Sequence, residues 1–301
     1  MRGTFTISID LELAWGIWDK PSATYFRLCA EKEERIVDGL LAMFERYDVP
    51  ATWAVVGRLL ERAERFPVET EHGDRIWYAP HLIEKVRASK SNQEVGSHSF
   101  EHVYFGQIDR ARATDDIQGA KRVHDQHGLD FVSFVFPRNQ VGHLDVLEQA
   151  GVRVFRSLDR GWFMDAAKWG GGVVGQAANL ADKIVPVPPQ VVEPLPSSAP
   201  GMVDLPSSTL LLARNGLRRL VTPLSVRVKN RLGLEAAKRQ RKLFHLWFHP
   251  SNFYYETDRQ LAVLESIVAG ASRMRDRGQL EIAPMSSFAP APSRAPRSAA
   301  S

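Results

Sequence analysis

The stretch EVGSHSFEH, residues 94–102, contains two histidines four positions apart, directly after a short run that reads as a β-strand. Two histidines at i and i+4 on a helical turn point the same way and could bind one metal ion. The spacing alone is a weak signal, because such pairs also occur on solvated helical faces. Whether His98 and His102 form a site therefore depends on a carboxylate elsewhere in the chain.

The stretch SIDLELAWG, residues 8–16, offers two carboxylates. Asp10 and Glu12 are two positions apart at the end of a predicted strand, so they share a face if the strand stays extended. Two histidines and one carboxylate form a common open zinc site, and a second carboxylate beside it could act as a general base. A helix cap or a salt bridge at the strand end would explain the same residues, and spacing alone does not decide between these interpretations.

Predicted strands and helices alternate along the chain, which favours parallel βα units in a barrel or a doubly wound sheet. The predicted strands are residues 4–9, 51–56, 94–97, 131–136, 152–157, 243–248 and 280–283, and the predicted helices are residues 31–47, 80–89, 109–127, 144–150 and 258–277. In either fold, functional residues gather at the carboxyl ends of strands. The polar residues at or just after predicted strand ends are Asp10, His98, Arg138, Asp159 and His249.

Composition predicts a soluble globular protein, with 44% hydrophobic and 25% charged residues. We expect one catalytic barrel over residues 1–288, an excursion at about residues 166–242, and a disordered tail at residues 289–301 that is rich in Pro, Ala, Ser and Arg. Asp10 interrupts the first apolar run, so we expect no signal peptide and a cytoplasmic protein. The single cysteine excludes an internal disulfide framework and a cysteine-rich zinc module.

The net charge of +4 comes from one basic stretch, Thr209 to Lys242, which has ten basic residues and one acid. It could be a solvated helical face, a nucleic-acid surface, or a surface for anionic lipid headgroups or a phosphate-bearing carrier. No nucleic-acid module accompanies it, so we expect no nucleic-acid partner. Leucines interleaved with the arginines favour an interfacial segment, peripheral to the inner face of the membrane.

Five motifs in this order resemble the polysaccharide deacetylase family, which includes peptidoglycan and chitin-oligosaccharide deacetylases. They are SIDLE (8–12), VPATWAVVG (49–57), EVGSHSFEH (94–102), FPRNQVG (136–142) and FHLWFHP (244–250). The resemblance extends from Phe5 to about Pro284. It implies a distorted (β/α) barrel and a divalent metal, usually zinc, with cobalt, nickel or manganese as alternatives. It also implies removal of an N-linked acyl group, usually acetyl, from an amino sugar in a glycan or a carrier-linked saccharide.

The resemblance also implies roles for residues that match the family motifs. Asp10 matches the aspartate that acts as general base. His98 and His102 match the two metal-binding histidines, and His249 matches the histidine that protonates the leaving amine. Many members have a second aspartate next to the first as a metal ligand. Here Leu11 follows Asp10, so the ligand role passes to Glu12.

The third motif departs from the family pattern, which usually has an arginine before the proline and an aromatic residue after it. Here Phe136 precedes Pro137, and Arg138 and Asn139 follow. We predict that Arg138 orients Asp10. We further predict that Asn139 lies at the substrate and that a backbone N–H near it contributes to the oxyanion site.

The remaining candidates are an acid and three tryptophans. Asp159 is a candidate to orient His249. Trp15, Trp18 and Trp162 are candidates for stacking on a sugar ring, although Trp15 and Trp18 could instead cover the mouth of the barrel.

Two other functions stay open. One is a deformylase or cyclic-amide hydrolase of the same fold, and the other is an inactive sugar- or lipid-binding barrel. Asp10 and His249 together argue against the inactive barrel, because a binding protein needs neither a base nor an acid.

Overall fold

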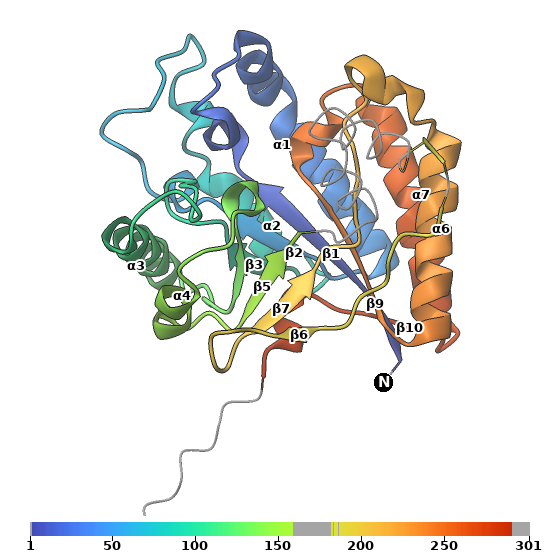
Figure 1. Cartoon of the computed structure of the whole chain (residues 1–301). Helices are drawn as coiled ribbons and strands as arrows, with labels where there is room; N and C mark the ends of the chain where they lie inside the picture. The colour runs from blue at the N-terminus through green and yellow to red at the C-terminus, as the bar shows by residue number, and fades with distance from the viewer. Residues whose placement is uncertain (1, 159–181, 183, 186, 291–301) are drawn as a thin grey trace, which may run out of the picture.

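Strands and helices alternate through the chain, as the sequence pattern predicts, and the strands form one curled sheet in a single α/β domain (Figure 1). The computed structural model describes residues 2–158, 182, 184–185 and 187–290. Within them the sheet has ten strands in the order β6-β7-β5-β4-β3-β2-β1-β9-β8, and β10 pairs with β1. The strands are β1 (Gly3–Leu11), β2 (Thr52–Val55), β3 (Glu94–Ser97), β4 (Ser133–Val135), β5 (Val154–Ser157), β6 (Leu195–Pro196), β7 (Val203–Pro206), β8 (Thr209–Leu210), β9 (Leu243–Phe248) and β10 (Leu280–Ile282).

Helices surround the sheet, and their ends are fixed by local capping. The α-helices are α1 (Ala23–Tyr47), α2 (Pro80–Ala88), α3 (Arg110–Gln126), α4 (Leu144–Ala150), α6 (Pro223–Gln240) and α7 (Thr257–Asp276), and the short 3-10 helices are η1 (Leu13–Ile17), η2 (Gly57–Leu59), η3 (Gly73–Ile76), η4 (Pro137–Asn139), η5 (Gly216–Leu220), η6 (Pro250–Phe253) and η7 (Met285–Phe288). Side chains of Ser22, Asp109 and Thr222 accept backbone N–H groups at the starts of α1, α3 and α6. None of the helices in the described residues combines the length and apolar character needed to span a bilayer.

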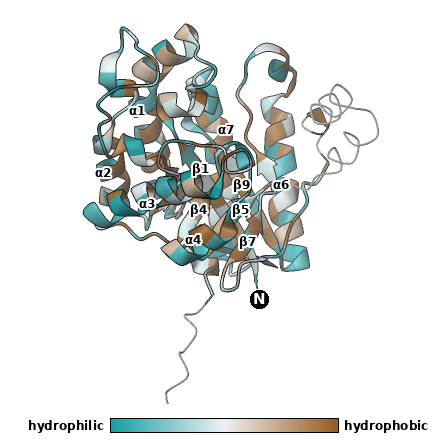
Figure 2. Ribbon diagram, turned by 60° about the vertical axis from the view of Figure 1, so that its left-hand side comes forward, coloured by the Kyte–Doolittle hydropathy of each residue, from teal (hydrophilic) through white to brown (hydrophobic). Residues whose placement is uncertain are grey.

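Strand β1 lies inside the sheet and is buried along its whole length. It pairs in parallel with β2 and β9, and its first residues also pair with β10. Its side chains alternate between apolar residues, such as Phe5 and Ile7, and polar residues, such as Ser8 and Asp10. Polar residues of one face contact one another across strands, as Ser8 Oγ does with His245 Nε2 at 2.9 Å. The alternation therefore directs Asp10 into the polar interior of the barrel. In Figure 2 the helices around the sheet carry both hydrophobic and hydrophilic residues.

One part of the sequence prediction needs correction. The basic stretch and the residues before it are not simply an excursion, because β7 pairs in parallel with β5, β8 pairs with β9, and α6 is a full helix. The strands β6 to β8 have two to four residues each and include prolines, so their periodicity is too short to detect. Asp159, Trp162, much of residues 166–186 and all but the start of the predicted tail lie outside the described residues.

Candidate active site

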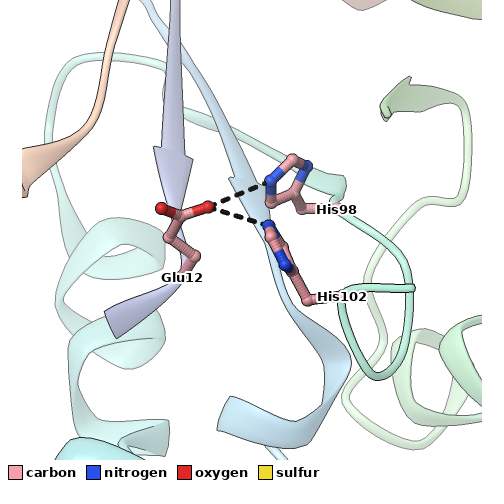
Figure 3. A group of neighbouring side chains, drawn as sticks. All are labelled: Glu12, His98 and His102. Atoms are coloured by element: carbon pink, nitrogen blue, oxygen red, sulfur yellow. Dashed lines mark ion pairs between the residues drawn. The ribbon is translucent and has the colours of Figure 1, made fainter. Parts of the chain in front are cut away.

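Three potential metal ligands meet at the carboxyl ends of β1 and β3 (Figure 3). Glu12 Oε2 lies 3.0 Å from His102 Nε2 and 3.3 Å from His98 Nε2. One ligand atom from each of the three residues lies within 4.8 Å of the others, and all three side chains are buried. This is a carboxylate and two imidazoles converging on one point, which is the donor set of an open divalent metal site.

The histidine pair sits on a bent loop and not on a helical turn. His98 directly follows β3, and Ser99 and His102 both have left-handed backbone conformations, with φ of 67° and 54°. The two imidazoles therefore converge without the helical turn that would bring an i and i+4 pair together. A side chain from another element holds the loop. The Asp116 carboxylate on α3 accepts hydrogen bonds from the backbone N–H groups of Phe100 and Glu101 at 2.8 and 3.0 Å.

The protonation states of the cluster suit metal binding. His98 Nδ1 contacts the Val135 carbonyl oxygen at 2.8 Å, so it donates its proton there and presents a bare Nε2 toward Glu12. Burial alone would raise the pKa of Glu12, but His249, His102 and His98 hold that pKa well below its usual range. Burial lowers the pKa of His102, against the opposing effect of Glu12. The lowered pKa values of Glu12 and His102 favour the carboxylate and the neutral imidazole, the forms of these two groups that bind a divalent cation.

Asp10 is held by an arginine that the sequence reasoning missed. Arg156 on β5 donates from Nη1 and Nη2 to the two carboxylate oxygens of Asp10, both at 2.7 Å. Arg156 is fully buried, and its guanidinium also stacks 4.2 Å from the centre of the Trp247 ring. Burial would raise the pKa of Asp10, but the charge of Arg156, with those of His249 and His98, outweighs burial and lowers it. An arginine inside the apolar run VRVFRS was the available signal, since a buried arginine needs an anionic partner.

Arg138 does not have the predicted role of orienting Asp10. Its Nη2 donates instead to the Gly16 carbonyl at 3.1 Å and to Asp19 Oδ1 at 3.4 Å. Arg138 therefore points toward η1. The arginine that contacts Asp10 is Arg156 on β5. The sequence prediction failed because it considered only the arginine nearest to the proline motif.

His249 lies beside both carboxylates at the end of β9. Its Nε2 is 3.5 Å from Asp10 Oδ2 and 3.6 Å from Glu12 Oε1. The other ring nitrogen, Nδ1, is 3.4 Å from Asn252 Oδ1, which also accepts the His249 backbone N–H at 2.8 Å. Among the described residues, Asn252 is thus the side chain that orients His249, whereas the predicted partner Asp159 lies outside them.

The sequence match agrees with this geometry. Residues 29–155 match the family model for polysaccharide deacetylases. Residues 29–155 are thus similar to the polysaccharide deacetylase family. The matched residues contain His98 and His102, whereas Asp10, Glu12 and His249 lie outside them and are brought to the site by the fold.

Solved structures share the curled barrel of this chain. A Mycobacterium smegmatis protein named for polysaccharide deacetylase activity aligns with a TM-score of 0.66 at 15% identity, covering 95% of this chain and 88% of that one. A Pseudomonas aeruginosa PAO1 protein with the same type of name aligns at 0.59 and 13% identity, covering 93% and 87%. Puue allantoinase aligns at 0.59 and 12% identity, with the same coverages. At these identities the likeness concerns the fold alone. No curated protein sequence matches the chain.

A cleft of about 610 Å³ is lined by Glu101, Val103 and Tyr104, the neighbours of His102 in the chain, and not by the three potential metal ligands themselves. The half-buried rings of Trp18 and Tyr104 stack on its wall, with centres 6.5 Å apart, and Trp18 Nε1 lies 3.5 Å from the His102 carbonyl oxygen. Trp15 also borders the cleft, but it is 4% exposed and donates from Nε1 to the Trp77 carbonyl at 2.9 Å. Trp15 is therefore a core residue, against the prediction of a sugar contact, and Trp18 is the tryptophan placed to meet a ligand.

The Asn139 side chain contacts Arg156, the arginine that pairs with Asp10. Its Oδ1 accepts from Arg156 Nη2 at 3.3 Å, and its own backbone N–H donates to the Phe136 carbonyl at 2.8 Å. The next backbone N–H, of Gln140, donates to the Pro137 carbonyl. The backbone N–H groups of residues 139 and 140 therefore already donate within the protein, and the oxyanion donor near Asn139 stays a prediction.

Proposed function

We propose that this protein is a metal-dependent hydrolase that removes an acyl group, usually acetyl, from an N-acylated amino sugar. The observation that carries the proposal is the meeting of two separate carboxylates around one histidine. Glu12 faces the two imidazoles, Asp10 faces Arg156, and His249 lies within 3.6 Å of both acids. The polysaccharide deacetylase match over residues 29–155 supports the same reaction class.

In this proposal Glu12, His98 and His102 would hold the divalent cation. When bound there, the cation would supply a Lewis acid that polarises the acyl carbonyl and makes water a better nucleophile. Zinc suits a site with two imidazoles and one carboxylate, although the same ligands accept cobalt, nickel or manganese.

Asp10 would take a proton from the attacking water, because its carboxylate is kept charged by Arg156 and lies next to the cluster. The water oxygen bonds to the acyl carbon, and negative charge develops on the acyl oxygen. His249 then donates a proton to the nitrogen as the carbon–nitrogen bond breaks, releasing acetate and the free amine. The 3.5 Å between His249 Nε2 and Asp10 Oδ2 allows the abstracted proton to return through His249.

The cleft supports a sugar as the substrate. Sugar rings present C–H faces that stack on aromatic side chains, and the Trp18–Tyr104 pair offers such a face directly beside His102. The fold shared with an allantoinase supports one alternative, the opening of a cyclic amide. A cyclic amide has no need for an extended aromatic cleft, so the amino-sugar substrate is favoured.

Mass spectrometry of acyl release tests this function. Purified protein with added zinc or cobalt is incubated with N-acetyl amino sugars and their oligosaccharides, with N-formyl amino sugars, and with small cyclic amides. We expect loss of acetyl from the N-acetyl sugars and no loss with a His98→Ala, His102→Ala variant. Preferred turnover of N-formyl sugars or cyclic amides would replace the proposed substrate, and the absence of any acyl release with metal supplied would favour an inactive binding barrel.

A further inference from the structure

The structure divides the ten basic residues of the stretch Thr209–Lys242 into two groups. Four have an acidic partner: Arg214 with Glu256, Lys229 with Asp182, Lys238 with Glu235, and Lys242 with Glu193. The others are exposed, and none of them forms an ion pair with a carboxylate of the described residues: Arg218, Arg219, Arg227, Arg231, Arg239 and Arg241. The charge available to a partner is therefore carried by these arginines.

Three leucines lie among the first of these arginines. Leu217, Leu224 and Leu220 are the most exposed large hydrophobic side chains of the described residues, at 74%, 69% and 58%. All three fall within eight residues, on η5 and the first turn of α6. Isolated exposed leucines are ordinary, but three clustered leucines interleaved with cations mark a contact surface.

At the start of α6, exposed leucine and arginine side chains also lie together on one helical face. Arg227 and Arg231 follow Leu224 at positions i+3 and i+7, so the three side chains form one stripe. We call the exposed residues Leu217, Arg218, Arg219, Leu220, Leu224, Arg227 and Arg231 the η5–α6 patch. Arg239 and Arg241 belong to the opposite end of the helix, where no exposed large hydrophobic residue accompanies them.

The η5–α6 patch lies at the same edge of the sheet as the candidate active site. The chain leaves β8 beside β9, where the Leu211 N–H donates to the Trp247 carbonyl. Gln260 Nε2 then donates to the Leu212 carbonyl at 2.8 Å and contacts the carbonyl of Asn252, the residue that orients His249. In Figure 1, η5 is the gold segment above α6, at the end toward which the β1 arrowhead points.

Arg214 holds the segment that carries the first part of the patch. Arg214 is 8% exposed and donates from Nε to Glu256 at 3.1 Å and from Nη1 to the Val221 carbonyl. These two contacts close the segment between residues 214 and 221 into a loop whose ends are tied to the domain. The exposed leucines are thus presented by a closed loop and a helix end, as a built surface.

We propose that the η5–α6 patch docks the protein on an anionic phospholipid bilayer. The leucines enter the boundary between headgroups and acyl chains, and the arginines bind the lipid phosphates while their apolar stems follow the leucines inward. A protein or nucleic-acid partner is less well matched, because the patch alternates bulky aliphatic side chains with cations and has no aromatic residue. Docking does not depend on the proposed function. If both hold, the active-site edge faces the bilayer, and the preferred substrate is an amino sugar held at the membrane surface by a lipid.

Sedimentation with vesicles tests the docking without any measure of activity. The full chain is mixed at low salt with vesicles of phosphatidylcholine alone and with vesicles that also contain phosphatidylglycerol. Two double variants are matched in charge: Arg227→Gln with Arg231→Gln inside the patch, and Arg239→Gln with Arg241→Gln at the other end of α6. A third variant replaces Leu217, Leu220 and Leu224 by serine. Circular dichroism checks that each variant keeps its fold.

We expect the wild type to bind the anionic vesicles and not the neutral ones. The variant of Arg227 and Arg231 should bind about 25-fold more weakly, since each cation near an anionic surface contributes roughly a factor of five. The leucine variant should lose a similar factor, and the variant of Arg239 and Arg241 should bind as the wild type does.

Three results would overturn the proposal. The first is no binding of the wild type to anionic vesicles at low salt. The second is equal weakening by the two arginine pairs, or none by the leucine variant, because diffuse charge would then explain binding. The third is full displacement by millimolar glycerol phosphate, which would make the patch a site for a soluble phosphate.

Discussion

Two acidic residues, Asp10 on β1 and Glu33 on α1, are both buried but differ in charge. Asp10 at the end of β1 is 2% exposed, and Glu33 on α1 is 4% exposed. Asp10 receives two hydrogen bonds from the Arg156 guanidinium, whereas Glu33 receives one from the neutral Tyr254 hydroxyl, at 2.6 Å. Burial raises the pKa of Glu33 to about 8, but the Arg156 charge overcomes burial at Asp10 and lowers its pKa.

This difference shows that burial does not by itself prepare a carboxylate for catalysis. A buried acid without a cation stays protonated at neutral pH and acts as a hydrogen-bonding core residue. A buried acid with a bidentate arginine stays charged and can accept a proton. Of these two acidic residues, only Asp10 is in the charged form that a general base needs.

Replacing each carboxylate by its amide should give the largest contrast. Asp10→Asn should lower the turnover number by on the order of 10²–10⁴, because the amide cannot accept the proton. Glu33→Gln should change it less than about twofold, because Glu33 is already neutral and the amide oxygen can still accept from Tyr254.

Acyl release and metal content are measured on both variants. Asp10→Asn should fold and keep its metal, since Asn retains an oxygen for Arg156. If Asp10→Asn loses its metal and regains activity when metal is restored, Asp10 and Glu12 have exchanged roles.

Removing the arginine should turn Asp10 into an acid like Glu33. Arg156→Met leaves the Asp10 carboxylate buried without its cation, which should lower the free energy of unfolding by about 3–5 kcal/mol. Arg138→Met is the matched control, because Arg138 donates to Gly16 and Asp19 and its side chain is 42% exposed. Urea unfolding at one pH gives both values. Equal losses for the two arginines would contradict the assignment of Arg156 to Asp10.

The pH dependence of stability should reveal the neutral Glu33. Its folded pKa of about 8 lies above its value in the unfolded chain, so its contribution is full below about pH 4 and is lost as the pH rises through 8. Between pH 6 and pH 8 the wild type should lose about 2 kcal/mol of unfolding free energy relative to Glu33→Gln, by the same linkage. Urea unfolding of both proteins at both pH values measures this, and a constant difference would show that Glu33 is charged when folded.

The smallest effect should come from Gly16→Ala, a substitution that places one carbon atom against the Glu12 side chain. A Cβ atom at Gly16 would lie 2.0 Å from Glu12 Oε1, so Gly16→Ala must move the carboxylate away from the histidines. We expect metal affinity to fall on the order of tenfold, as when a group supporting a metal ligand is altered. Gly270→Ala is the control, because its Cβ meets only Leu234 at 3.8 Å. Competition with a chelator measures both, and unchanged affinity in Gly16→Ala would mean that Glu12 is not a ligand.

The sequence predicted those features that depend on local pattern. Strand–helix alternation predicted the barrel, and β3, α4 and β9 have the predicted bounds. The cluster of Glu12, His98 and His102 was found because parallel strands end at one edge. The Arg156–Asp10 pair could not be found this way, because it joins residues 146 positions apart through the curl of the sheet. The shape of the histidine loop could not be predicted from the sequence, because it depends on Asp116, a long-range acceptor on α3.

Metal content tests the central claim, that Glu12, His98 and His102 form a metal centre, most directly. Inductively coupled plasma mass spectrometry is applied to the wild type, to a His98→Ala, His102→Ala variant, and to a His81→Ala, His127→Ala variant with two histidines removed elsewhere. We predict one divalent metal ion per chain in the wild type and in the second variant, and almost none in the first, with circular dichroism showing that all three are folded. Full stoichiometric metal in the His98→Ala, His102→Ala protein would contradict the account.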